Sequence, residues 1–117
     1  MFQQVATKLF LDDSINPIEH SQAVMVEEGS TAVLEAQLFN RTGSSDVTLN
    51  LQVSDDLENW KTVTTTLDEI TFSSSAVVAL GRTEVSATIN TRYCRLLYAI
   101  GSSSTALLAA SIRTAKN

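Results

Sequence analysis

Several residue types that define common protein classes are scarce in this chain of 117 residues. The single cysteine, Cys94, rules out an intramolecular disulfide, and with it a disulfide-stapled secreted scaffold. One proline and four glycines argue against low-complexity disorder. His20 and Cys94 are too few to build a zinc site, which needs several His or Cys ligands.

Basic residues and long apolar runs are also in short supply. The net charge is −5 and the isoelectric point is near 4.6, so the surface repels phosphate backbones and we expect no nucleic-acid partner. No apolar run approaches the length of a membrane-spanning helix, which argues against a membrane partner. The first residues lack a basic segment followed by an apolar one, so we expect no signal peptide and synthesis in the cytoplasm.

What is present is a β pattern, clearest over Val47–Ser54. Apolar residues alternate with polar ones along VTLNLQVS, which predicts a strand with one buried face. An acidic turn, Asp55–Asn59, follows, and then comes Trp60. We therefore predict a hairpin that anchors a β-sandwich, within a single domain spanning residues 1–117.

Further strands are predicted between clusters of turn-forming residues. Two segments, AVLEAQLF and ALLAASIRTA, are also compatible with helix, but their β neighbours favour strand. A last hairpin is predicted around the Gly101–Ser104 turn, and residues 12–19 are predicted to be irregular. The result is an all-β fold, an antiparallel two-sheet β-sandwich or jelly roll of about eight strands. The other predicted strands are Gln4–Leu11, Ser21–Glu27, Ala32–Asn40, Lys61–Leu67, Ala76–Leu80, Val85–Ile89, Tyr93–Ile100 and Thr105–Thr114.

The carboxylates raise two questions of chemistry. Asp55, Asp56 and Glu58 could supply oxygens to calcium, but the EF-hand spacing is absent. We favour a hairpin turn in which an Asp side chain caps backbone amides. The pairs Asp12-Asp13 and Asp68-Glu69 would have to face each other across a cleft to act as a glycosidase, and small sandwiches rarely enclose one.

Neither His20 nor Cys94 has the partner residues that a catalytic site requires. No serine lies in a Gly-x-Ser-x-Gly elbow that could use His20, so we predict that His20 is exposed. Cys94 alternates with Leu96, Tyr98 and Ile100, which predicts a buried thiol. We predict that the chain is not an enzyme and has no cofactor or metal.

Two kinds of large side chain could mediate binding. Trp60 is predicted to be a core anchor that fills the space between the sheets, although an exposed indole could stack on a sugar or a partner. Arg92, Arg95 and Arg113 could pair with acidic residues of a partner subunit, or could be ordinary solvated strand positions.

Two segments resemble known β-sandwich modules. Ser54-Asp55-Asp56-Leu57-Glu58-Asn59-Trp60 is similar to the Ser-Asn-Asp-x-x-x-Trp turn of discoidin-like surface-binding domains and small bacteriophage head proteins, with Asp55 in place of asparagine. Arg92-Tyr93-Cys94-Arg95-Leu96 resembles the arginine-tyrosine-valine-arginine-leucine strand of the same modules, with Cys94 in place of valine. In those modules the alternate residues of this strand pack beneath the tryptophan.

Because the chain is small and lacks the bridging cysteines of many discoidin domains, it looks more like a phage capsid decoration (cement) protein. The resemblance implies a protein made in the host cytoplasm that binds the major capsid protein at the capsid surface of the virion, as a homotrimer. Residues 1–11 are then either a contact arm, through Phe2, Val5, Leu9 and Phe10, or an edge strand. The alternative function is a carbohydrate- or surface-binding module of a phage tail or bacterial adhesin.

Overall fold

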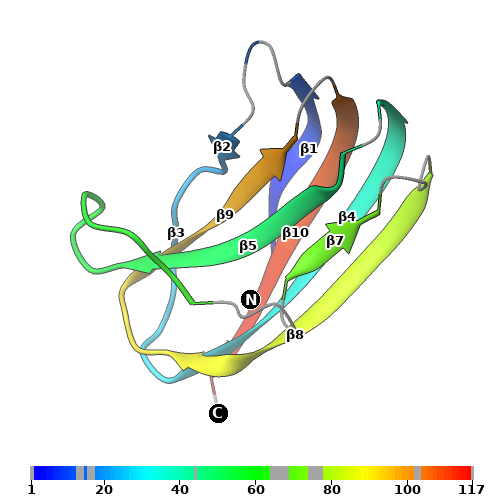
Figure 1. Ribbon diagram of the computed structural model, residues 1–117. Coiled ribbons are helices and arrows are strands. Elements are labelled where there is room, and N and C mark those ends of the chain that lie inside the picture. The colour runs from blue at the N-terminus through cyan, green and yellow to red at the C-terminus, as the bar shows by residue number, and fades with distance from the viewer. Residues whose placement is uncertain are drawn as a thin grey trace.

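A computed structural model shows an all-β protein made of two antiparallel sheets packed face to face (Figure 1), which confirms the predicted fold class. It describes residues 2–12, 15, 18–43, 45–63, 69–73, 78–101 and 104–116, and for residues 2–9, 87 and 116 the backbone alone. Within these residues there is no helix that could cross a membrane.

Sheet A has four strands in the order β1-β10-β4-β8. All neighbouring strands in it are antiparallel, and the long β10 and β4 form its centre. The strands of sheet A are β1 (Phe2–Asp12), β4 (Ser30–Thr42), β8 (Ala79–Ile89) and β10 (Thr105–Lys116).

Sheet B has β9 and β5 at its centre and shorter strands along both sides. On one side β2 and β3 both pair with β9, and on the other side β6 and β7 both pair with β5. Its strands are β2 (Ile18–His20), β3 (Val24–Met25), β5 (Val47–Ser54), β6 (Lys61–Thr62), β7 (Ile70–Phe72) and β9 (Tyr93–Ile100).

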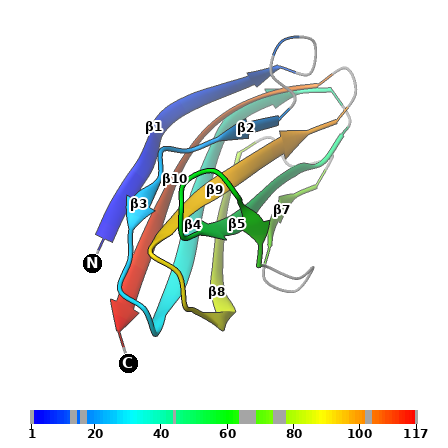
Figure 2. The same cartoon turned by 90° about the vertical axis from the view of Figure 1, so that its left-hand side faces the viewer.

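The chain alternates between the sheets. It runs from β1 in sheet A to β2 and β3 in sheet B, back to β4, across to β5, β6 and β7, back to β8, across to β9 and back to β10 (Figure 2). When β2 with β3 and β6 with β7 are each taken as one interrupted strand, eight strand positions remain, which is the arrangement of a jelly roll. The predicted hairpin between β9 and β10 is wrong, because the turn at Gly101 carries the chain from sheet B to sheet A.

The core lies between the two sheets and is built by strict alternation. In β5 and β9 the inward residues face each other in register, with Leu49 opposite Tyr98 and Leu51 opposite Leu96. Sheet A contributes the matching inner face, with Leu34 and Ala36 on β4 among its buried residues. The bounds of β5 and β9 coincide with the predicted ones, because each strand is half-buried along its whole length.

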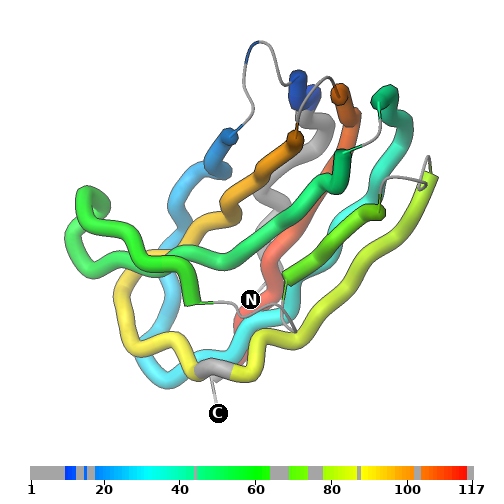
Figure 3. Tube along the Cα trace, viewed as in Figure 1, coloured from blue at the N-terminus to red at the C-terminus, as the bar shows by residue number. Residues whose placement is uncertain are grey.

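Other predicted bounds need correction. The segment predicted to be irregular, residues 12–19, overlaps the short strand β2, and β7 is a strand that the sequence pattern does not predict. The two strands predicted at Ala76–Leu80 and Val85–Ile89 are one continuous strand, β8. The strand predicted at Lys61–Leu67 is described only to residue 63, and residues 64–67, 76 and 77 lie outside the described part. The N-terminal segment forms an edge strand, since β1 pairs with β10 alone (Figure 2). Figure 3 follows the neighbouring strands β5 and β9 of sheet B along the Cα trace.

A buried arginine side chain lies at one end of the sandwich. Arg41, at the end of β4, is 7% exposed, and its guanidinium donates hydrogen bonds to the carbonyls of Ser45 and Ser73. The two carbonyls belong to the segments that come after β4 and β7, so one side chain ties two connections together. The Nε of Arg41 has no hydrogen-bond partner in the described structure.

Gly81 on β8 packs tightly against side chains of β7 in sheet B. A Cβ atom added at Gly81 would lie 2.6 Å from Cγ2 of Ile70 and 3.3 Å from Cε1 of Phe72. Both neighbours are buried on β7, so neither can move away freely. Glycine is thus required here for packing and not for its backbone freedom.

We predict that Gly81→Ala destabilises the fold by about 1–3 kcal/mol, because the added methyl overpacks the contact with Ile70. Chemical denaturation measures this change. Ile70→Ala removes the clashing Cγ2 atom, so the double variant should lose less stability than the sum of the two single variants. Additive losses would contradict the proposed contact.

Candidate functional site

The acidic turn between β5 and β6 is held by its own side chains. The Asp56 carboxylate accepts hydrogen bonds from the backbone N–H of Glu58 at 2.9 Å and of Asn59 at 2.8 Å. The Ser54 hydroxyl accepts from the N–H of Leu57 and donates to Asp56. The prediction of an Asp side chain capping backbone amides is confirmed, and both oxygens of Asp56 serve the turn because Asn59 Nδ2 donates to the second one.

The turn also orients the tryptophan that comes directly after it. Leu57 has a positive φ of 66°, a conformation that is uncommon outside glycine and that reverses the chain sharply. The indole N–H of Trp60 donates to the Leu57 carbonyl at 3.1 Å. Asp55 reaches across to accept a hydrogen bond from the backbone N–H of Arg92. The indole is therefore anchored to the turn, and the turn is anchored to the start of β9.

The prediction that Trp60 fills the core is wrong. The side chain is half-buried and is not part of the core cluster. Its ring lies over the guanidinium of Arg95, 4.0 Å from the ring centroid to Cζ. Cys94 and Leu96 point into the core, so Arg95 points outward, and the stacked indole lies on the outer face of sheet B.

Arg95 is fixed from a second side. Its Nε donates to Gln52 Oε1 on β5 at 2.9 Å, and Gln52 Nε2 donates in turn to Thr62 Oγ1 on β6. Partial burial lowers the pKa of Arg95, although the group remains a cation at neutral pH. A planar guanidinium over an indole face is a favourable cation–π arrangement. As the resemblance implied, an alternate residue of β9 packs beneath the tryptophan.

The other predicted contact residues do not converge on this place. Arg92 is exposed beside the acidic turn, whereas Arg113 lies in sheet A, 3.9 Å from Glu35. Phe10 is exposed on β1, in the other sheet from Arg95. The side chains of Phe2, Val5 and Leu9 lie outside the described residues, so their predicted contact role stays a prediction.

The thiol of Cys94 is not a reactive nucleophile. Cys94 is fully buried, and burial raises the pKa of its thiol to about 11, so the reactive thiolate is scarce at neutral pH. His20 is exposed, as predicted. Slight desolvation of its ring, followed by the nearby Arg95 charge, lowers the pKa of His20. Burial also raises the pKa of Tyr98. The nearby Ser21 hydroxyl lowers the pKa of Tyr98 and so partly offsets this rise. That hydroxyl accepts a hydrogen bond from Leu96 N and donates one to Gln22 O. In the described structure the phenol oxygen of Tyr98 has no hydrogen-bond partner.

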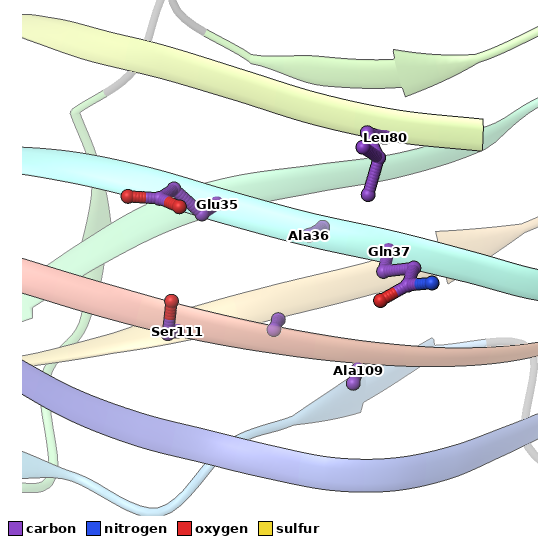
Figure 4. Close-up of a pocket in the computed structure, with 7 residues that line it drawn as sticks. Glu35, Ala36, Gln37, Leu80, Ala109 and Ser111 are labelled. Carbon is purple, nitrogen blue, oxygen red and sulfur yellow. The ribbon is translucent and has the colours of Figure 1, made fainter.

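A shallow pocket of about 220 Å³ lies on the outer face of sheet A. Glu35, Gln37 and Leu80 stand around it, and Ala109 and Ser111 leave room by their small size (Figure 4). Glu35 is the titratable group among its described lining residues, and no histidine, cysteine or lysine lies beside Glu35 and Ser111 there. Within the described part of the chain, no group of three or more His, Cys, Asp or Glu residues could hold a metal. Asp13 and Asp68 lie outside that part.

An exposed apolar end is the feature that sequence patterns missed. Among the described residues, seven large apolar side chains are exposed, and five of them lie where β1 ends, β2 begins and β8 begins. Figure 1 shows these strand ends at one end of the sandwich. Isolated apolar residues in turns and at strand ends carry no periodicity, so their common position at this end becomes visible only in three dimensions. Phe10 and Leu80 lie at opposite edges of the outer face of sheet A, and Ile18 lies on the outer face of sheet B, so these side chains surround the end and do not form one patch. We define the apolar end as Phe10, Ile15, Ile18, Val78 and Leu80.

Comparisons with known proteins show the fold and no family. No protein-family model matches the sequence, and a search of curated proteins finds no match. Among solved structures, VP2 of an infectious bursal disease virus subviral particle superposes with a TM-score of 0.59 at 10% identity, over 100% of this chain and 32% of VP2. This chain therefore spans about a third of the VP2 chain.

Two further structures match over nearly their whole length. PirA has a TM-score of 0.51 at 10% identity, covering 95% of this chain and 94% of PirA. Eiger TNF from S. frugiperda has a TM-score of 0.53 at 10% identity, covering 99% of this chain and 92% of that one. At such identities the likeness establishes a shared β-sandwich architecture and nothing about activity.

We predict that Asp56→Ala destabilises the protein at neutral pH and that this loss shrinks in acid. Hydrogen bonds from the Asn59 and Glu58 amides, then from the Asn59 and Ser54 side chains, lower the pKa of Asp56 in the folded state. A lowered folded pKa means that the ionised carboxylate contributes stability above its unfolded pKa of about 3.9, and that this contribution fades as the pH falls below that value.

Thermal unfolding of both proteins between pH 7 and pH 2, followed by Trp60 fluorescence, measures this difference. Glu58→Ala, in the same exposed turn, is the control and should show no such pH dependence, because no hydrogen bond to its carboxylate holds the turn in the described structure. An Asp56→Ala difference that stays constant with pH would contradict the capping role.

Proposed function

We propose that this protein is a non-enzymatic structural component of a bacteriophage particle that binds the outside of the capsid and stabilises the shell. Its partner is the major capsid protein, and its location is the capsid surface of the virion. We propose that the protein binds as a homotrimer and that it binds neither nucleic acid nor membrane. The observation that carries it is the apolar end.

Exposed apolar surface of this kind is costly for a monomer in water. Leu80 is 80% exposed and Ile15 is 78% exposed, and both lie at the same end of the sandwich as Phe10. We propose that these exposed side chains, placed around one end of the sandwich, take part in a protein–protein contact. The described residues offer no catalytic set that would favour an enzyme, and the fold is one that also occurs in VP2 of a viral particle.

Shell stabilisation follows from selective binding. A protein that binds the assembled, expanded shell and not the free capsid subunit favours the assembled state by mass action. A trimer engages three sites at once, so weak contacts at each apolar end combine through effective concentration. The edge-strand position of β1 makes residues 2–12 part of sheet A, so substitutions test the contact better than removal of the segment.

We predict that the protein cosediments with expanded shells assembled from the major capsid protein encoded in the same genome. Phe10→Ser should weaken this binding about tenfold, because roughly half of a phenylalanine side chain would no longer be buried in the contact. Met25→Ser is the matched control, since Met25 is 73% exposed on β3, away from the apolar end, and should bind normally.

Thermal unfolding of the free variants checks that both remain folded. The absence of any shell-bound protein, or equal loss of binding in both variants, would contradict the proposal. A genome that encodes no capsid protein near this chain would argue against it as well.

A second candidate function is carbohydrate or surface binding through Trp60. The specific observation is that the indole lies outside the core, on the outer face of sheet B, with Arg95 and Gln52 fixed beside it. An aromatic ring next to oriented hydrogen-bonding groups is a common arrangement in small-molecule sites. This function requires the exposed part of the indole to stack on a sugar ring.

We predict for this second function that a glycan array detects binding that Trp60→Ala abolishes. Phe10→Ser should leave glycan binding unchanged, because Phe10 lies in the other sheet. An array without specific binding at millimolar sugar concentration, or binding that survives Trp60→Ala, would exclude Trp60 as a sugar platform.

A further inference from the structure

The free edges of the two sheets differ in how well they are protected. An open strand edge presents unpaired N–H and C=O groups to any other strand, and proteins commonly blunt such edges with breaks, bulges or charges. Sheet A ends in β1 and β8, and sheet B ends in β2 with β3 on one side and β6 with β7 on the other.

Three of these edges are interrupted. The pairing of β1 with β10 shifts register twice, between Gln4 and Ala6 and again between Ala6 and Leu9. Both edges of sheet B consist of strands of only two or three residues. None of the three offers a long regular template for another strand.

The fourth edge is regular. From Ala79 to Val85, every residue of β8 faces one residue of β4 without a register shift. No strand in the described part of the chain pairs with the other side of β8. This stretch is therefore an ordered seven-residue template for a further strand.

The side chains along this edge carry charges of both signs at alternate positions of β8. Arg82 and Glu84 both project from the outer face of sheet A, and Arg82 Nη2 lies 3.3 Å from Glu84 Oε1. Both are mostly exposed, with side-chain exposures of 56% and 71%. Leu80 precedes them on the same face and is almost fully exposed.

This order of residues is self-complementary about Thr83. If two β8 strands lie antiparallel with Thr83 at the two-fold axis, Arg82 of each copy faces Glu84 of the other. Leu80 of each copy then faces Ser86 of the other, which removes part of its apolar surface from water. Opposite charges directly across an antiparallel pair stabilise it, and like charges destabilise it.

We propose that β8 is a homodimerisation edge, at which two copies of this chain join their A sheets through antiparallel β8–β8 pairing centred on Thr83. The contact is isologous, so it closes after two copies and does not propagate into a fibre. The inference does not depend on capsid binding. It is an alternative to the homotrimer proposed above, because a two-fold contact of this kind produces a dimer, and the mass of the species in solution distinguishes the two.

Charge reversal tests the pairing. In Arg82→Glu, residues 82 and 84 are both acidic, and in Glu84→Arg both are basic, so each variant on its own places like charges opposite each other. In an equimolar mixture the acidic strand meets the basic one, and the pairing becomes favourable again. Arg113→Glu is the matched control, because it also reverses an arginine paired with a glutamate on sheet A, but on β10 at the sheet centre.

Sedimentation velocity over a concentration series measures the outcome. We expect wild type and Arg113→Glu to form a species of twice the 12.7 kDa monomer mass. Each β8 variant alone should dimerise at least about tenfold more weakly, and the mixture should recover a heterodimer. Recovery cannot come from repair within one copy, since each variant keeps its own like-charged pair.

Three results would overturn the proposal: a wild type that stays monomeric up to millimolar concentration, a trimer whose mass neither β8 variant changes, or a mixture that associates no better than its components. Shell binding by Phe10→Ser is a separate measurement, so loss of the dimer and loss of capsid binding are distinguishable. Phe10→Ser should dimerise like wild type, because Phe10 lies on β1 at the opposite edge of sheet A.

Discussion

The antiparallel register between β5 and β9 is the constraint on which the rest of the structure depends. Val47, Leu49, Leu51 and Val53 face inward, opposite the inward residues of β9, along the whole length of both strands. A shift by one residue would turn every apolar side chain of β5 to solvent and bury its polar residues. The same register decides which residues of β9 face outward, so it also places Arg95 where the indole meets it.

The tight turn after β5 fixes the position of the Trp60 indole on the outer face of sheet B. Asp56 satisfies the amides of the turn, and Leu57 supplies both the reversal of the chain and the carbonyl that anchors the indole. Because the N–H of Trp60 is bonded within the turn, the ring is held over Arg95 without entering the core. Among the described residues, the hydrophobic core is filled mainly by aliphatic side chains, together with Tyr98 and Phe72.

Strand bounds and burial could be predicted from the sequence where apolar and polar residues alternate over a long segment. The eight-residue strands β5 and β9 show full alternation, so their bounds and the burial of Cys94 could be predicted. β2 and β7 have three residues each, too few to display a period. The Gly101 turn indicates a chain reversal, but the same residues can join strands of one sheet or of two. Trp60 comes after a five-residue turn, so the alternation of β5 no longer determines which face it takes.

Neither candidate contact surface could be derived from periodicity, because both depend on which elements meet at an end or an edge. The apolar end gathers residues from β1, the segment before β2 and the start of β8. The β8 edge becomes visible only once the order β1-β10-β4-β8 is known. Since β1 and β8 are opposite edges of sheet A, pairing through β8 leaves Phe10, Ile15 and Ile18 accessible. A dimer joined through β8 would therefore present these three residues twice, and, with the capsid contact proposed above, it would bind a repeating lattice more tightly than a single copy does.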